Sequence, residues 1–251
     1  MLNQKFYWGT IRKAIVAFGN LFNNIHIDRK DGSGNVIQTL KVPLSYAPRA
    51  KFLARIEALP DAVNQQYQTL LPRMAFEMSN IQYDGNRKIS LLQQTRSIPT
   101  GSTTTLNTQY APTPYNVDIT LYVYTKNQDD GLQIVEQILP FFNPDFNLSL
   151  NTIPQLGIKN DLPIILNSVT YEDDYEGDFS RRRAIIWTLN FTLKLNFYGP
   201  VNRQGIIRRT TIDMFNNPEL TQKIQTYNAV VDPNSAVPGD SIDVIESFED
   251  F

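Results

Sequence analysis

A dense charged run occupies residues 172–183, where five acids precede three consecutive arginines. The acids are Glu172, Asp173, Asp174, Glu176 and Asp178. Clustered carboxylates can bind a cation, and two carboxylates that meet across a cleft can hydrolyse a glycosidic bond. A calcium loop, however, places a bidentate acid several positions after its glycine, and residues 180–186, which follow Gly177, contain no acid. The pattern therefore favours a solvated turn between two strands, and hydrolysis stays an alternative without a companion motif.

Phosphate binding is the first chemistry that three adjacent arginines suggest, so Arg181, Arg182 and Arg183 are candidates for DNA contact. Strand alternation, however, would send Arg182 to the opposite side from its two neighbours. The five adjacent acids also cancel the local field. Two interpretations therefore stay open beside DNA contact: a turn whose charges pair with one another, and a salt-bridge site against a neighbouring subunit. Exposed pairs of either kind contribute only ~0–1 kcal/mol.

Other catalytic residue types are scarce in this sequence. His26 is the single histidine, and its place in the alternating run IHID is typical of a strand position. Cysteine is absent, which excludes disulfides, thiolate metal sites and cysteine nucleophiles. The glycines Gly32 and Gly34 belong to a turn, and no phosphate-cradling loop is present. We therefore expect no cofactor, no metal and no enzymatic activity.

Hydrophobic periodicity indicates the elements that position the charged run. In chain order it predicts a helix at 7–22, strands at 24–28 and 36–42, a helix at 46–59, strands at 73–83 and 115–127, a helix at 129–142, and strands at 162–173, 185–197 and 205–215. Asp130 is expected to cap its helix together with Gln133. The residues of that helix expected to face inward are Leu132, Val135, Ile138 and Leu139.

The clearest pattern lies directly after the arginines, where apolar residues alternate from Ile185 to Phe197. A period of two predicts an antiparallel-type strand with one buried and one largely wetted face. Residues 84–114, by contrast, are rich in Ser, Thr, Pro and Gly and predict a long loop. The order of elements predicts an α+β fold: a mixed, mainly antiparallel β-sheet with helices packed on one side, long loops and an extended acidic C-terminal arm.

Charge is distributed unevenly over the chain. Residues 216–251 hold seven acids and one lysine, a net charge of −6, so the remainder carries +4 within a total of −2. Such a balance attracts neither DNA nor an anionic membrane at long range. No run approaches the ~20 apolar residues of a membrane span. We expect a soluble protein with one α+β domain at 1–215 and an acidic extended arm or disordered tail at 216–251.

Five stretches carry a family pattern: FYWGTIRKAIVAFGNLFNNIHIDR, VPLSYAPRAKFLARI, TQYAPTPYNVDITLYVYTKNQDDGLQIVEQILPFFNPDFN, SRRRAIIWTLNFTL and GIIRRTTIDMF. Together they resemble the tail sheath stabiliser and completion proteins of T4-like contractile-tailed bacteriophages. The resemblance runs from about Phe6 to Phe215, and residues 129–147 with the later SRRR and tryptophan strand are its most specific part. The acidic segment after Asn216 does not resemble the family closely.

The resemblance implies a structural virion protein made in the bacterial host cytoplasm. Family members form a hexameric ring at the head-proximal end of the tail, where they cap tube and sheath and join the neck. The implied partners are further copies of the chain, the tail sheath protein, the tail tube or tail terminator protein, and neck proteins of the head. An acidic turn on one subunit that meets Arg181–Arg183 on the next would fix register.

A neck or baseplate adaptor is the alternative location for such a protein. Phage DNA passes through the channel of such a ring, and we expect no specific nucleic-acid binding there. The arginines should therefore not line the lumen, because a ring would multiply their charge.

Overall fold

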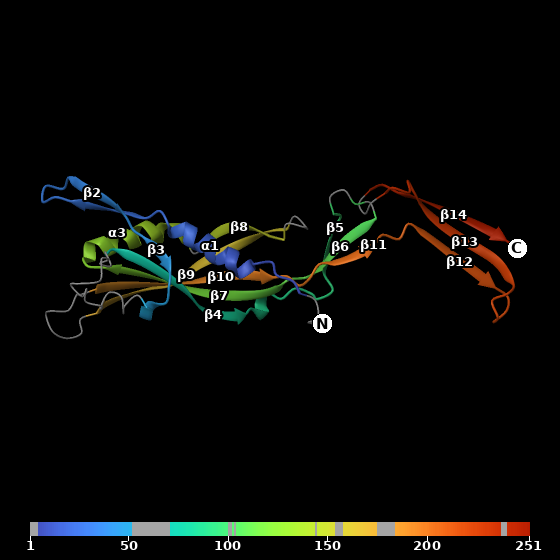
Figure 1. Cartoon of the computed structure of the whole chain (residues 1–251), viewed down its shortest axis with the longest axis horizontal. Helices are drawn as coiled ribbons and strands as arrows, with labels where there is room; N and C mark the ends of the chain where they lie inside the picture. Colours follow the sequence, from blue (N-terminus) through green and yellow to red (C-terminus); the bar gives the residue numbers. More distant parts are fainter. Residues whose placement is uncertain are drawn as a thin grey trace, which may run out of the picture.

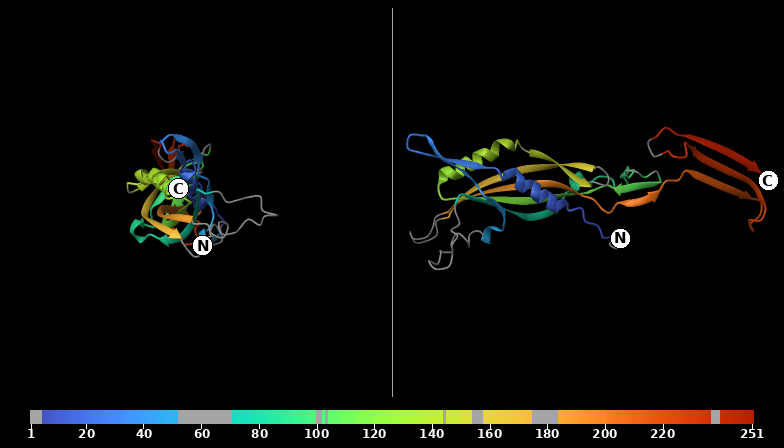
Figure 2. Two further views of the ribbon diagram at one scale, coloured as in Figure 1. Left: turned by 90° about the vertical axis from the view of Figure 1, so that its left-hand side faces the viewer. Right: turned by 45° about the horizontal axis from the view of Figure 1, so that its top comes forward.

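The computed structural model describes residues 5–51, 71–99, 102, 104–143, 145–153, 158–174, 184–236 and 240–251. The molecule is elongated (Figure 1). A six-stranded sheet with its helices occupies one end, a small three-stranded sheet lies in the middle, and a second three-stranded sheet carries the C-terminus at the far end. The right-hand view of Figure 2 shows the same succession after rotation about the long axis.

The N-terminal part follows the predicted order of helix and hairpin. It contains α1 (Thr10–Phe22), β1 (His26–Lys30), β2 (Val36–Lys41) and β3 (Leu44–Tyr46). The carboxylate of Asp31 closes the β1–β2 turn by accepting the backbone N–H groups of Ser33 and Asn35, each at 2.9 Å. These bonds lower the pKa of Asp31, because they favour its ionised form. The predicted hairpin is confirmed.

The remaining elements are β4 (Arg73–Tyr83), η1 (Gly85–Arg87), β5 (Gln94–Ser97), β6 (Thr105–Tyr110), β7 (Thr113–Thr125), α3 (Gln128–Ile138), η2 (Leu139–Phe141), β8 (Asp145–Ile153), β9 (Ile158–Asp174), β10 (Ala184–Phe197), β11 (Asn202–Gly205), β12 (Arg209–Phe215), β13 (Lys223–Asp232) and β14 (Asp243–Asp250). The seven predicted strands are present as β1, β2, β4, β7, β9, β10 and β12, whereas the other seven described strands were not predicted. Of the helix predicted at 46–59, the structure describes residues 49–51 as helical, and the rest lies outside the described residues.

The main sheet has the order β3-β4-β7-β10-β9-β8. Its strands pair antiparallel except β3 and β4, which run parallel, so the sheet is mixed and mainly antiparallel as predicted. The long strand β10 is central and pairs with both β7 and β9. This position explains its apolar alternation, because a central strand presents one whole face to the core.

Both long helices pack on the same face of this sheet. Phe18 and Phe22 of α1 lie against Phe191 of β10, with ring centroids 5.2 and 5.5 Å apart. Ile134 and Ile138 of α3 join the same buried cluster. Burial of each such side chain stabilises the fold by about 1.5–3 kcal/mol. Sheet and helices together are consistent with the predicted α+β class.

The opposite face of β10 is not wetted along its whole length, which corrects the prediction. Ile186 is fully buried there in a second small cluster with Ala75, Tyr122 and Tyr124. Thr188 is also buried on this face, and partly exposed polar side chains follow from Asn190 onward. Alternation shows which residues share a face, but it does not show whether another segment covers the second face.

Helix α3 differs from its prediction at both ends. It begins at Gln128 after Asn127, so Asp130 lies inside the first turn rather than at the cap. Burial raises the pKa of Asp130, partly opposed by Arg29 at 3.6 Å. Leu132 and Leu139, expected inside, are exposed by 38% and 41%. The buried apolar positions are Ile134, Val135 and Ile138, so two of the four predicted inward residues are confirmed.

The polar stretch at 84–114, expected as a long loop, contributes η1, β5 and β6. Strands β5 and β6 form the middle sheet with β11, in the order β11-β6-β5. The buried positions of β6 are Asn107, Thr108 and Gln109, which no hydrophobic pattern could mark. Gly199 connects the middle sheet to the main body. Its carbonyl accepts hydrogen bonds from Trp8 Nε1 at 2.9 Å and from Gln109 Nε2 at 3.1 Å.

The acidic segment contributes two strands to the C-terminal sheet, whose order is β12-β13-β14. The strand predicted at 205–215 is present as β12, and its partner is β13 rather than a strand of the main sheet. Strand pairing therefore crosses residue 216. The segment predicted to be an extended arm or a disordered tail is extended and hydrogen-bonded.

Candidate interaction surfaces

The predicted charged site lies at the end of the main sheet where β9 leaves and β10 returns. Glu172 is near the end of β9, and the backbone of Asp173 and Asp174 pairs with Ile185 and Ala184 of β10. The other predicted site residues lie outside the described residues; they are Glu176, Asp178, Arg181, Arg182 and Arg183. The structure thus places the three acids of β9 at one end of the main sheet. Their pairing with the arginines stays a prediction.

Glu172 has a partner that the sequence analysis missed. Its carboxylate accepts a hydrogen bond from the guanidinium of Arg49, which lies 123 residues earlier in the chain. This hydrogen bond raises the pKa of Arg49, and the guanidinium also lies 5.9 Å from the ring centre of Tyr122. The hydroxyl of Tyr122 donates in turn to Glu77 at 3.0 Å. Local charge neutralisation at this end therefore uses a residue distant in sequence.

A second surface is the polar face of the main sheet, where amides and hydroxyls bond across strands. Thr192 is central: its hydroxyl accepts from Asn167 at 2.7 Å and donates to Asp118 at 2.7 Å. Asn190 donates to Ser168 at 3.0 Å in the same way. All of these groups except Ser168 line a hollow that lies over β4, β7, β9 and β10. Apart from Asp118, such a face offers neutral donors and acceptors to another protein, and desolvating neutral groups costs less than desolvating ions.

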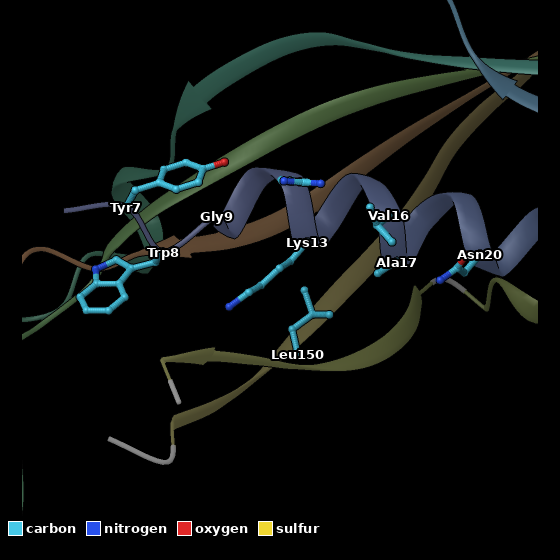
Figure 3. Close-up of a pocket in the computed structure, with 9 residues that line it drawn as sticks. Tyr7, Trp8, Gly9, Lys13, Val16, Ala17, Asn20 and Leu150 are labelled. Carbon is cyan, nitrogen blue, oxygen red and sulfur yellow. The ribbon is translucent and has the colours of Figure 1, made fainter. Parts of the chain in front are cut away.

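A third surface is an open groove of about 580 Å³ beside α1 (Figure 3). Its lining residues are Tyr7, Trp8, Gly9, Arg12, Lys13, Val16, Ala17, Asn20 and Leu150. Lys13 bridges its two walls, because its ammonium donates to the carbonyl of Asn151 on β8 at 3.1 Å. Tyr7 and Val16 are exposed by 78% and 53%. The groove is mainly apolar and its charged lining residues are both basic.

The fourth surface is the C-terminal sheet, which exposes apolar side chains of all three strands. Every residue of β14 is exposed, with Val244 at 53% and Phe248 at 61%. On β12, Ile212 and Met214 are exposed by 49% and 41%. The apolar residues Val244, Ile245 and Phe248 were the available sequence signal, but the acids between and around them obscured it.

Within the ranges that the structure describes, no group of three or more His, Asp or Glu side chains is arranged to hold a metal ion. His26 lies exposed on β1, and its Nδ1 is 3.0 Å from the carbonyl oxygen of Asn24. No helix in the described part of the chain is long and apolar enough to cross a membrane.

Comparison with known proteins gives two concordant matches. Residues 5–250 match the family of the T4-like virus Myoviridae tail sheath stabiliser. The chain is 31% identical over 249 residues to the tail completion protein gp15 of Enterobacteria phage T4, covering 94% of this chain and 89% of that protein. The family match reaches the acidic C-terminal segment, which the resemblance from sequence motifs had left out.

Proposed function

Because the chain belongs to the tail sheath stabiliser family of T4-like myoviruses, we propose that it acts as a non-enzymatic ring subunit of a contractile tail. Six copies form a ring at the head-proximal end, where the ring caps tube and sheath, keeps the sheath extended and joins the tail to the neck. The partners are further copies of the chain, the tail sheath protein, the tail tube or tail terminator protein, and neck proteins.

The observation that carries this proposal is the family match from residue 5 to residue 250, which includes the β1–β2 hairpin and the three larger sheets. The T4 relative is named for tail completion, a role in assembly rather than in catalysis. The shape of the chain supports the same role, because a long subunit with an outlying sheet can reach its neighbours (Figure 1). Closed rings arise when such head-to-tail contacts return to the first subunit.

The charged end of the main sheet is one proposed subunit contact. In this hypothesis the acids Glu172, Asp173, Asp174, Glu176 and Asp178 of one subunit face Arg181–Arg183 of the next. Glu172 is 48% exposed at its side chain while paired with Arg49, so it retains access to a further cation. These pairs would fix the register of the ring more than its affinity.

Charge reversal tests this contact. Arg182→Glu with Arg183→Glu should reduce the fraction of chain in rings at physiological salt, whereas Arg203→Glu with Arg209→Glu is a control of equal charge change. Ring formation by the first pair at the wild-type level would refute the contact.

Electron microscopy of the purified chain, alone and added to tails that lack the family protein, tests the function itself. We expect six-fold rings that attach to the head-proximal end and prevent sheath contraction. Attachment at the baseplate instead would establish the adaptor alternative, and tails that contract as before would contradict the stabilising role.

A further inference from the structure

The C-terminal sheet stands apart from the rest of the molecule with both faces open. Figures 1 and 2 show β12, β13 and β14 at the far end, with no described helix or strand over either face. A small sheet gains stability in water when a hydrophobic face is packed against another element. This sheet has the apolar residues for such packing but does not bury them within its own chain.

Strand register sets the aromatic rings of Tyr227 and Phe248 on one face of the sheet, while Ile224, Val230 and Ile245 lie on the other. Ile212, Tyr227 and Phe248 lie in one row across the three strands, and the rings of Tyr227 and Phe248 are 5.0 Å apart. Alternation along β14 adds Val244 to this face and places Glu246 between the two apolar residues. The opposite face carries more polar groups; its central row is Thr211, Asn228 and Ser247. We call the first the apolar face of the sheet.

The apolar face is bordered by acids. Glu246 and Asp250 belong to it by alternation along β14. Residues 209–251 as a whole hold eight acids and two bases, a net charge of −6, whereas residues 1–208 carry +4. A second copy of the chain is therefore an electrostatically complementary partner for this sheet.

The groove beside α1 complements the apolar face in polarity and charge. It is an apolar trough with the two basic residues Arg12 and Lys13 and no acid in its lining. An apolar trough with two cations complements a strand face on which Val244 and Phe248 alternate with Glu246 and Asp250. Lys13 already donates to a backbone carbonyl, but an ammonium has three donors and can bind a carboxylate as well.

The groove and the C-terminal sheet cannot meet within one molecule, because α1 lies in the main body and β14 at the opposite end (Figure 1). We propose that the apolar face of one copy docks in the α1 groove of the next, with Phe248 in the trough and Glu246 and Asp250 beside Arg12 and Lys13. This contact is head-to-tail, and it rests on the self-assembly that the proposed function requires.

Complementary charge reversal tests the pairing in the full-length chain. The groove variant carries Arg12→Glu and Lys13→Glu, and the sheet variant carries Glu246→Lys and Asp250→Lys. Each alone should weaken assembly roughly tenfold or more, because like charges would then face each other. An equimolar mixture should regain assembly, since each copy then meets a neighbour of opposite charge at both surfaces.

The matched control is Asp243→Lys with Glu249→Lys, which makes the same charge change on the opposite face of β14. The control should assemble as the wild type does, measured for all chains by analytical ultracentrifugation over a concentration series. Restoration in the mixture also shows that both variants fold.

Three results would overturn the pairing. They are wild-type assembly by either variant, equal loss in the sheet variant and its control, and no recovery in the mixture. Rings that form normally in the variants would refute this pairing but leave the proposed function standing. A wild-type chain that forms no ring and does not protect tails would refute the proposed function as well.

Discussion

The main sheet and the C-terminal sheet use the same alternating pattern with opposite results. In the main sheet Leu121 and Phe191 are fully buried, because α1 and α3 cover that face. In the C-terminal sheet Val244 and Phe248 stay more than half exposed. The contrast indicates that the main body stabilises itself, whereas the C-terminal sheet depends on a neighbour for its packing. Substitutions should therefore affect folding in one region and assembly in the other.

The largest contrast is expected between two phenylalanines. Phe191→Ala removes a ring that packs against Phe18, Phe22 and Phe142. It should lower the free energy of unfolding by about 3–5 kcal/mol. Phe248→Ala should leave the unfolding of the dilute chain nearly unchanged and weaken assembly instead. Denaturant unfolding at low protein concentration measures the loss of stability, and sedimentation measures the loss of assembly. Equal losses of stability in the two variants would contradict the contrast between the two sheets.

A smaller effect on the main body is expected at Gly131. A Cβ there would lie 2.5 Å from Trp187 Nε1 and 3.2 Å from Thr125 Oγ1, so α3 needs glycine to approach β10. Gly131→Ala should destabilise the chain by about 1–3 kcal/mol despite the better helix propensity of alanine. Gly205→Ala is the control, because its Cβ meets nothing within 4 Å. A thermal midpoint for Gly131→Ala at or above wild type would show that the packing is loose.

Lowering the pH should reduce the stability of both the main body and the C-terminal sheet, because each contains an ion-paired carboxylate. Arg87 lowers the pKa of Asp84 through a 2.8 Å ion pair in the main body, and Lys223 lowers the pKa of Asp213 through one of 2.7 Å in the C-terminal sheet. A lowered folded-state pKa gives stability that is present above the unfolded value, near 3.9, and lost as pH falls through the folded value.

The corresponding variants separate the two regions. Arg87→Met should raise the pKa of Asp84 and leave Asp213 unchanged, and Lys223→Met should do the reverse. Carboxyl titration by NMR measures both values. A shift of both carboxyls by one substitution would show that the regions are electrostatically linked.

The smallest effect is expected for the Arg49–Glu172 pair, whose side chains are 34% and 48% exposed. Solvent screening limits such a pair to about 0–1 kcal/mol. A double-mutant cycle with Arg49→Met and Glu172→Gln measures the coupling by thermal unfolding. A coupling well above this range would mean that the pair also organises the end of the main sheet.

The sequence predicts the main sheet well because its strands have strong local signals. The run from Ile185 to Phe197 marks a central strand, and the glycine-rich turn at residues 29–35 marks the first hairpin. The middle sheet escapes prediction because its buried residues, such as Gln109, are polar and depend on partners far along the chain. The partner of Glu172 escapes for the same reason, since Arg49 is distant in sequence.

The C-terminal strands show a different limit of sequence analysis. Acids and Pro233 separate the apolar residues after Asn217, and this composition is also typical of disordered tails. Strand pairing satisfies the backbone there, but the apolar side chains stay exposed in the single chain. Apolar residues separated by acids and proline are the same sequence pattern in an unfolded tail and in a sheet that packs against another subunit.

Hydrogen exchange at several protein concentrations tests the central claim most directly. Backbone amides of β7 and β10 should be protected equally in the dilute chain and in the assembled ring. Amides of β13 and β14 should exchange rapidly in the dilute chain and gain protection as rings form. Protection of β13 and β14 that is already complete in the monomer, or that does not rise with assembly, would contradict the account.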